Sequence, residues 1–200
     1  MNAVSSIIRT LADDEDHAAY LSLRARLWGR RDNPSDLDAY DRQAVVFGAF
    51  TVDGRLRAAL RLVTPGHDSP NLEAFRRAVA RHGLGGLDSL EVPLRCRIAT
   101  EESFPITPVL DALERDSRQY VEIGRLMRSE HPGDPWAVIR LLKHAFAEAQ
   151  QLGYRQAIAM CTAPHLRPWK RYGFQPVPGM PMRIERSTGK TCLSVWADVE

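Results

Sequence analysis

The stretch that decides the fold is Tyr120-Val-Glu-Ile-Gly-Arg-Leu-Met127, a short apolar run that predicts a central β-strand. The polar loop Ser129-Glu-His-Pro-Gly-Asp-Pro135 separates this run from the best helix of the chain, which is predicted over residues 136–152. Asp134 suits the N-cap of that helix, and the proline after it suits the first helical position. A further strand is predicted over 156–160, so the segment forms a strand–loop–helix–strand unit.

Outward from this unit, the sequence predicts a single mixed α/β domain that spans residues 1–200. Apolar runs over 45–52 and 56–63 flank Asp53-Gly54, and Asp-Gly between two such runs is the strongest short signal for a hairpin. Residues 32–41 form a polar loop that contains Pro34. The other predicted elements are strands over 5–11, 94–98, 174–177 and 191–197, helices over 14–28, 71–82, 105–113 and 165–172, and a Gly-rich turn over 83–86.

The composition excludes several classes of protein. Hydrophobic residues make up 44% and charged residues 26% of the chain, and its formal net charge is +2. This balance is ordinary for a globular protein, and the charge is too small for nucleic-acid binding by bulk electrostatics. The sequence shows no signal-peptide pattern and no window near the roughly 18 apolar residues of a membrane span. We therefore expect a soluble, cytoplasmic protein with no nucleic-acid partner and no membrane span; its oligomeric state stays open.

The cysteines and histidines do not have the spacing of a metal site or a disulfide framework. Cys96, Cys161 and Cys192 are far apart and form no CxxC pair. An odd, scattered set of this kind favours reduced thiols in the core. The six histidines show no pattern such as HxxxH. No metal is therefore predicted.

The loop before the long helix is a candidate anion site. Backbone N–H groups at the start of a helix are unpaired, and the helix dipole favours negative charge there. A pyrophosphate or the phosphate of a phosphopantetheine arm would fit this position, and an ordinary capped helix is the alternative. Neither GxxxxGK[ST] nor GxGxxG is present. The candidate residues for phosphate contact are Arg128, His131, Gly133 and Asp134.

Glu122 and Arg125 are the candidate catalytic residues. Positions three apart fall on opposite faces of a strand unless a bulge intervenes. A buried carboxylate and guanidinium are costly to desolvate, so they are expected either to form a structural ion pair or to take part in chemistry. If the strand is bulged, its backbone N–H groups are suited to stabilise an oxyanion.

Two sets of motifs resemble one superfamily. Arg171-Tyr-Gly-Phe174, between a predicted helix and a strand, is by itself only a helix-stop signal. Together with the strand–loop–helix unit it resembles the C-terminal half of the GNAT acyltransferases, over residues 120–177. The N-terminal half is similar to the autoinducer synthase branch, which includes acyl-homoserine-lactone synthases and long-chain N-acyl amino acid synthases. The matching positions are Arg24 with Trp28, Asp38-Ala-Tyr-Asp41, Arg61, Phe104-Pro-Ile106, and Glu122 with Arg125.

The resemblance implies a GNAT-like three-layer fold, with a central mixed twisted sheet flanked by helices. It implies transfer of a medium or long acyl chain from a thioester to the α-amine of an amino acid or similar small amine. The donor would be acyl-phosphopantetheine on an acyl carrier protein or coenzyme A, with no permanently bound cofactor. Glu122 would organise the amine or deprotonate it through a water, because an ammonium is not a nucleophile. Substrate-binding roles would fall to Arg24, Trp28, Asp38, Asp41, Arg61 and Phe104.

Departures from the branch leave alternatives open. Gly124 stands where the pattern E-x-S-R has serine, and the loop between Trp28 and Asp38 is short and lacks a tryptophan. These differences disfavour, without excluding, a homoserine-lactone synthase that uses S-adenosylmethionine. Residues 64–103 are longer than in compact members, which predicts an insertion or a rebuilt substrate pocket. A non-catalytic acyl-binding module and a plain acetyltransferase are further alternatives. Direct attack on the thioester is expected, with Cys161 as an inert core thiol.

Overall fold

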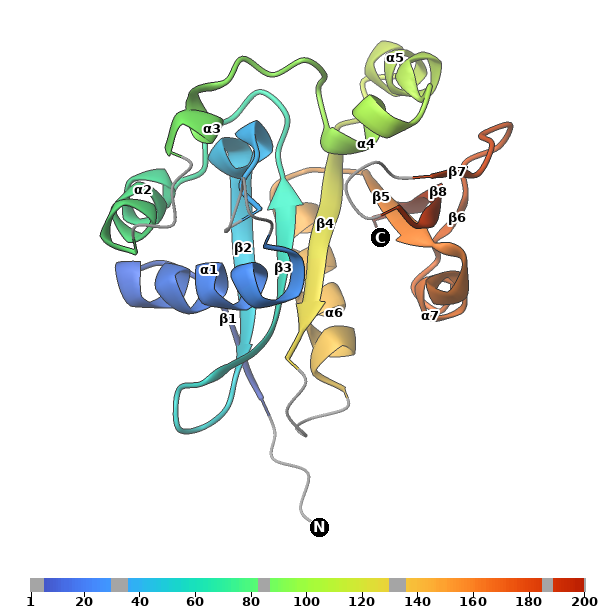
Figure 1. Cartoon of the computed structure of the whole chain (residues 1–200). Helices are drawn as coiled ribbons and strands as arrows, with labels where there is room; N and C mark the ends of the chain where they lie inside the picture. The colour runs from blue at the N-terminus through green and yellow to red at the C-terminus, as the bar shows by residue number, and fades with distance from the viewer. Residues whose placement is uncertain (1–5, 30–35, 83–86, 130–135, 185–188, 200) are drawn as a thin grey trace. The chain divides into compact units, whose positions relative to one another are not determined.

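The computed structural model describes residues 6–29, 36–82, 87–129, 136–184 and 189–199. Contacts group the chain into two compact units. Figure 1 labels the helices and strands that make them up. Unit 1 contains residues 1–94 and 125–145, and unit 2 contains residues 95–124 and 146–200. The strand β4 (Tyr120–Arg128) and the helix α6 (Ala137–Gln151) contribute residues to both.

Unit 1 is built on an antiparallel sheet. Strand β1 (Ile7–Thr10) pairs with β2 (Ala44–Phe50), and β2 pairs with β3 (Leu56–Val63) across the predicted Asp53-Gly54 turn. The hairpin prediction is confirmed. The remaining elements of the unit are the helices α1 (Asp14–Trp28), α2 (Leu72–Arg81) and α3 (Leu87–Glu91), and the 3₁₀ helix η1 (Ala39–Gln43).

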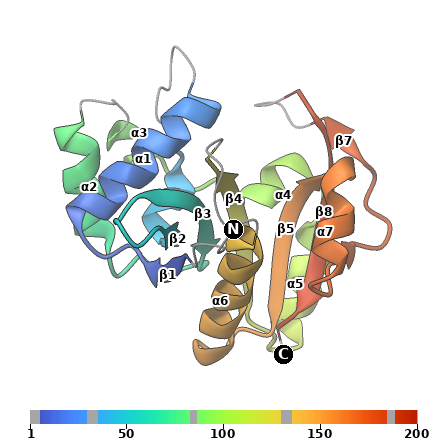
Figure 2. The same cartoon turned by 90° about the horizontal axis from the view of Figure 1, so that it is seen from below.

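Helices lie on both faces of the unit 1 sheet (Figure 2). On one face, α1 and α2 bury apolar side chains such as Tyr20 and Phe75 against the strands. On the other, Phe47 of β2 meets His144 of α6 edge-on, with 5.2 Å between ring centroids. Gly48 is required within this core, because a Cβ there would lie 2.5 Å from a ring carbon of Phe50. The strand therefore presents two buried faces, as its apolar sequence indicates.

Unit 2 combines parallel and antiparallel pairing. The start of β4 runs parallel to β5 (Gln156–Thr162), with Glu122 opposite Ile158 and Ile123 opposite Ala159. Strand β8 (Thr191–Asp198) pairs with β5, and the short strands β6 (Gln175–Pro176) and β7 (Arg183–Ile184) both pair with β8. The helices are α4 (Ala99–Ser103), α5 (Thr107–Arg115), α7 (Leu166–Lys170) and the 3₁₀ turn η2 (Ala163–His165).

The core of unit 2 lies between its strands and the helices α4 and α5. It contains Ile98, Phe104 and Leu110 from the helical segment and Ile158 from β5. A second aromatic group joins Phe174 to Trp169 of α7 and Phe146 of α6, with centroids 4.6 and 5.5 Å apart. In the described residues the strands are hydrogen-bonded in the order β1-β2-β3-β4-β5-β8-β6, with β7 on β8. The prediction of a mixed α/β fold with a helix-flanked sheet is confirmed.

Several local predictions need correction. The strand predicted over 94–98 is wrong, because the extended backbone of Ile98 belongs to the N-cap of α4 and not to the sheet. Part of the predicted loop over 32–41 forms the start of η1, and β7 was not predicted. The turn over 83–86 and the start of the long helix at Asp134 lie outside the described residues. Among the residues described, no helix is both long enough and apolar enough to cross a membrane.

Candidate functional site

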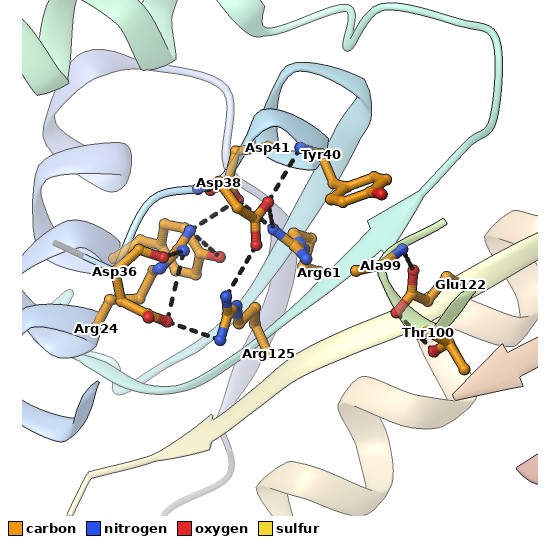
Figure 3. A network of polar contacts seen from close by, with 11 residues as sticks. Arg24, Asp36, Asp38, Tyr40, Asp41, Arg61, Ala99, Thr100, Glu122 and Arg125 are labelled. Carbon is orange, nitrogen blue, oxygen red and sulfur yellow. Dashed lines mark hydrogen bonds and ion pairs between the residues drawn. The ribbon is translucent and has the colours of Figure 1, made fainter. Parts of the chain in front are cut away.

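A cluster of six charged side chains occupies the interior of unit 1 (Figure 3). Three are arginines and three are aspartates, so their formal charges cancel. The ion pairs close into a ring in which each charge meets two of opposite sign. We call it the charge ring. Its order is Arg24, Asp41, Arg61, Asp38, Arg125 and Asp36, with Asp36 meeting Arg24 again.

Asp41 holds the buried part of the charge ring together. Its Oδ1 accepts hydrogen bonds from Nη1 of Arg24 at 2.7 Å and from Nη1 of Arg61 at 2.8 Å. Its Oδ2 accepts the backbone N–H of Asp38 at 3.0 Å. Arg24 is 0% exposed and Arg61 2%. Burial alone would lower the pKa of the Arg24 guanidinium, but the charge and hydrogen bond of Asp41 together with Tyr20 outweigh burial and raise that pKa.

Asp38 connects the ring to the local fold of η1. Its side chain accepts the N–H of Tyr40 at 3.1 Å, and together with Asp41 it forms a reciprocal capping box. It also pairs with Arg61 at 2.6 Å and with Arg125 at 2.8 Å. Burial favours its protonated form, but the positive charges of Arg61 and Arg125 outweigh burial and hold the pKa of Asp38 well below its usual range. Asp38 is therefore a carboxylate at neutral pH.

Asp36 is the member of the ring that sequence reasoning missed. Its Oδ2 lies 2.7 Å from Nη1 of Arg125, and its backbone carbonyl accepts a short hydrogen bond from Nη2 of Arg24. Burial raises the pKa of its carboxyl group. The sequence does contain one signal for its role: Asp36 and Asp38 flank Leu37, which is 3% exposed. An apolar residue between two aspartates indicates that the segment is anchored in the core.

The backbone of β4 is irregular at Arg125. Its φ of +50° lies in the left-handed region, where residues other than glycine are uncommon. Asp36, its ion-pair partner, also has a positive φ of +51°. Such conformations cost on the order of 1–3 kcal/mol and persist where surrounding contacts fix them. The two ion pairs of Arg125 and the indole of Trp28, whose ring centroid lies 5.5 Å from the guanidinium carbon, supply those contacts.

Glu122 has two hydrogen-bond partners at the start of α4, in unit 2. Its Oε2 accepts the backbone N–H of Ala99 at 2.7 Å, and its Oε1 accepts the hydroxyl of Thr100 at 2.9 Å. The residue is 4% exposed. Glu122 therefore caps the start of α4, which had been predicted neither as a helix nor as its partner. Arg125 pairs with Asp36 and Asp38.

Apart from Glu122, the predicted site residues fall into four groups. The charge ring brings together Arg24, Asp38, Asp41, Arg61 and Arg125, with Trp28 against it. Phe104 is 2% exposed and packs in the core of unit 2. Arg128 is exposed at the end of β4. His131, Gly133 and Asp134 lie outside the described residues, so the phosphate site stays a prediction.

Cys161 is the residue whose thiol could in principle act as a nucleophile. Cys161 is buried and free, and burial, with a smaller effect of Cys192, raises the pKa of its thiol to about 11. The thiol is therefore protonated at neutral pH, and a thiol is a weak nucleophile. Within the described part of the chain, no group of three or more histidine, cysteine, aspartate or glutamate residues is arranged to hold a metal ion.

Several solved structures with a similar fold are described as acyltransferases or acyl-transferring synthases. No protein-family model matches the chain, and no curated protein matches it in sequence. FeeM, an N-acyl amino acid synthase from uncultured soil microbes, superimposes with a TM-score of 0.64 at 11% identity, over 97% of this chain and 91% of its own. BjaI, a CoA-dependent acyl-homoserine lactone synthase, gives 0.59 at 16%, over 98% and 84%. YhbS, a GNAT family N-acetyltransferase from Escherichia coli solved with CoA, gives 0.54 at 12%, over 100% and 84%.

The chain has the GNAT acyltransferase fold. The fold expected from the motifs at 120–177 is thereby confirmed, and the matches cover nearly the whole chain. At identities of 11–16% they establish the GNAT fold and not the reaction. The prediction that residues 64–103 form an insertion stays a prediction; they contain α2, α3 and α4.

Proposed function

We propose that the protein is an N-acyltransferase that moves a medium or long acyl chain from a thioester to the α-amine of an amino acid. The single observation that carries the proposal is the graded exposure of the charge ring. Arg24, Arg61, Asp36 and Asp41 have side chains that are at most 6% exposed, whereas those of Asp38 and Arg125 are 25% and 23% exposed. A ligand therefore meets one carboxylate and one guanidinium, 2.8 Å apart.

This exposed pair is complementary to an amino acid. An α-ammonium group is recognised by a carboxylate such as Asp38, and an α-carboxylate by the forked N–H donors of Arg125. The four buried members of the ring fix the positions of the two exposed ones. Trp28, against Arg125, adds an apolar surface beside the pair. The structural similarity to FeeM, an N-acyl amino acid synthase, supports the same acceptor class.

In this proposal the donor is acyl-phosphopantetheine, carried by coenzyme A or by an acyl carrier protein. The long helix α6 and the loop before it would receive the phosphate, with Arg128 beside them. Backbone N–H groups near Gly124 would stabilise the oxyanion, and Glu122 would hold the neighbouring part of β4 to the start of α4. A long acyl chain gains about 0.8 kcal/mol for each buried CH₂, which is enough to select chain length.

The test compares acceptors and arginine variants. The protein is incubated with C2, C8 and C14 acyl thioesters of coenzyme A and of acyl carrier protein, together with pooled amino acids, and acyl-amide products are detected by mass spectrometry. Each productive amino acid is then compared with the amine that lacks its carboxylate. We expect wild type to prefer the amino acid and Arg125→Gln to lose that preference. Arg76→Gln is the matched control, because Arg76 also makes two ion pairs but lies on α2.

Other outcomes identify the alternatives. A lactone formed with S-adenosylmethionine would identify a homoserine-lactone synthase, and products from C2 donors alone would identify an acetyltransferase. Stabilisation by acyl thioesters without turnover would identify a non-catalytic acyl-binding module. The proposal is wrong if no amide forms with any donor, or if Arg125→Gln leaves the preference for the carboxylate intact.

A further inference from the structure

Trp28 is the last residue of α1, and its indole lies against a member of the charge ring. The guanidinium carbon of Arg125 lies over the indole, 5.5 Å from the ring centroid. Trp28 is itself partly buried against the core of unit 1. We propose that this indole selects the acceptor, so that the protein acylates amino acids that have an aromatic side chain. The inference rests on the proposed function and names the class of its acceptor.

The first support is the position of Trp28 relative to the groups that would hold the acceptor. Asp38 would bind the α-ammonium group and Arg125 the α-carboxylate, and these two side chains meet at 2.8 Å (Figure 3). The side chain of an amino acid starts at the Cα that joins those two groups. It therefore begins beside the guanidinium of Arg125, which lies over the indole. Trp28, Asp38 and Arg125 all belong to unit 1, so the arrangement lies within one compact unit.

The second support is that the indole is held in place. Trp28 packs against a core cluster that includes Leu23 of α1, the buried Leu37 and Met127 of β4. These three side chains come from separate segments of unit 1. A side chain that is already fixed loses little conformational freedom when a ligand binds. The indole is therefore a preformed aromatic surface beside Arg125.

The third support is the charge balance of the ring. Its three arginines and three aspartates cancel, and each charge has two neighbours of opposite sign. An acceptor with an acidic or basic side chain would bring a third charge for which the ring has no counter-charge. Unpaired charges are one means by which a site rejects the wrong ligand. The ring therefore favours acceptors whose side chain is neutral.

Both groups beside the acceptor favour an aromatic ring over an aliphatic chain of similar size. An indole pairs with another aromatic ring edge-on or offset, which strengthens binding by about 2- to 12-fold beyond the effect of burial. A guanidinium such as that of Arg125 also stacks on aromatic faces. Leucine would gain only from burial of its side chain, and alanine from burial of one methyl group. The expected order of affinity is therefore phenylalanine, leucine, alanine and glycine, with aspartate and lysine below alanine.

The first test measures binding of free amino acids without an acyl donor. Isothermal titration calorimetry gives the Kd of phenylalanine, leucine, alanine, glycine, aspartate and lysine for the wild-type protein. We expect phenylalanine to bind at least about tenfold more tightly than alanine and about threefold more tightly than leucine. The values of kcat/KM for amide formation, with the productive donor of the acceptor experiment, should follow the same order. Where binding is too weak to measure without the donor, the order of kcat/KM decides.

Two variants of Trp28 separate selection from folding. Trp28→Leu keeps an apolar side chain but loses the aromatic ring, so the preference for phenylalanine over leucine should disappear. Trp28→Phe should keep most of that preference. A general loss of structure would weaken all amino acids alike, whereas we expect the Kd of alanine to change by less than about threefold. Trp196→Leu is the matched control, because Trp196 is also partly buried against a core cluster, but in unit 2.

The outcomes separate this inference from the proposed function. The inference is overturned, and the proposed function stands, if amides form but glycine, aspartate or lysine is preferred, or if leucine equals phenylalanine in the wild type. It is also overturned if Trp28→Leu retains the preference for phenylalanine over leucine. If the amino acids bind in the expected order but no amide forms with any donor, the proposed function fails and the selection by Trp28 stands. Absence of both binding and product overturns both.

Discussion

Asp41→Asn is the sharpest test of the charge ring, because it changes one charge and almost no volume. Three donors converge on Asp41: the guanidinium groups of Arg24 and Arg61, at 2.7 and 2.8 Å, and the backbone N–H of Asp38 at 3.0 Å. An asparagine has one oxygen and one NH₂ group. Whichever way it turns, its NH₂ must face at least one of these donors. The ring also gains a net positive charge in a buried place.

The magnitude follows from the burial of the partners. Removing one partner of a buried ion pair costs about 3–5 kcal/mol, because the remaining charge stays buried without compensation. In a chain of this size, 1 kcal/mol corresponds to about 2–4 °C, so the melting temperature should fall by about 6–20 °C. Urea and thermal unfolding followed by circular dichroism measure the change. Hydrogen exchange should show the loss of protection concentrated in α1 and η1.

Asp111→Asn is the control for this prediction. Asp111 also pairs with an arginine, Arg97, at 2.8 Å, but its side chain is 55% exposed. Exposed ion pairs contribute about 0–1 kcal/mol. If Asp41→Asn destabilises the protein no more than Asp111→Asn, the ring is effectively solvated. The division into buried supports and an exposed recognition pair would then fail.

Two further predictions concern buried groups outside the ring. His17 is 2% exposed, packs edge-on against Phe75 at 5.3 Å and has no hydrogen-bond partner for either ring nitrogen among the described residues; burial lowers its pKa to about 4. The His17 imidazole binds a proton near pH 6.5 in the unfolded chain but only near pH 4 in the folded protein. About 3 kcal/mol of stability that is present above pH 6.5 should therefore be lost as the pH falls to 4. Urea titrations of His17→Leu should lack this part of the acid destabilisation, and an equal loss in both proteins would show that His17 is not responsible. Cys161→Ala should retain its rate of amide formation, since the thiol, with a pKa of about 11, is protonated at neutral pH. Inactivity of a folded Cys161→Ala would point instead to an acyl-enzyme.

The elements that were predicted correctly are those with local signals. Asp53-Gly54 defined the hairpin, and the apolar spacing defined the helices α1, α2 and α6. The strand over 94–98 failed because Ile98 is both β-branched and extended, yet it begins a helix. What fixes its role is the carboxylate of Glu122, 24 positions later in the chain. A window of sequence does not contain that partner.

The sequence indicated most of the residues of the charge ring, but not how they contact one another. The order of charged residues in the chain indicated five of the six members of the charge ring, and the structure brings those five together. It did not indicate Asp36, whose role depends on a left-handed backbone and on a partner, Arg125, far along the chain. Nor did it separate Glu122 from the ring, because sequence proximity to Arg125 says nothing about which segment each side chain meets.

The closed form of the ring determines what a ligand can do there. Each charge already has two opposite neighbours, so a substrate gains only by sharing or exchanging one of these contacts. Exchange is easiest where the pair is partly solvated, which restricts it to Asp38 and Arg125. A zwitterionic amino acid replaces the ion pair between Asp38 and Arg125 with two ion pairs, one to each of its own charged groups. The net charge of the ring is then unchanged. A simple amine or a simple acid adds a charge that the buried members do not compensate. Under the proposed function we therefore expect the ring to favour an amino acid over either fragment of it, which is the selectivity that the acceptor experiment measures.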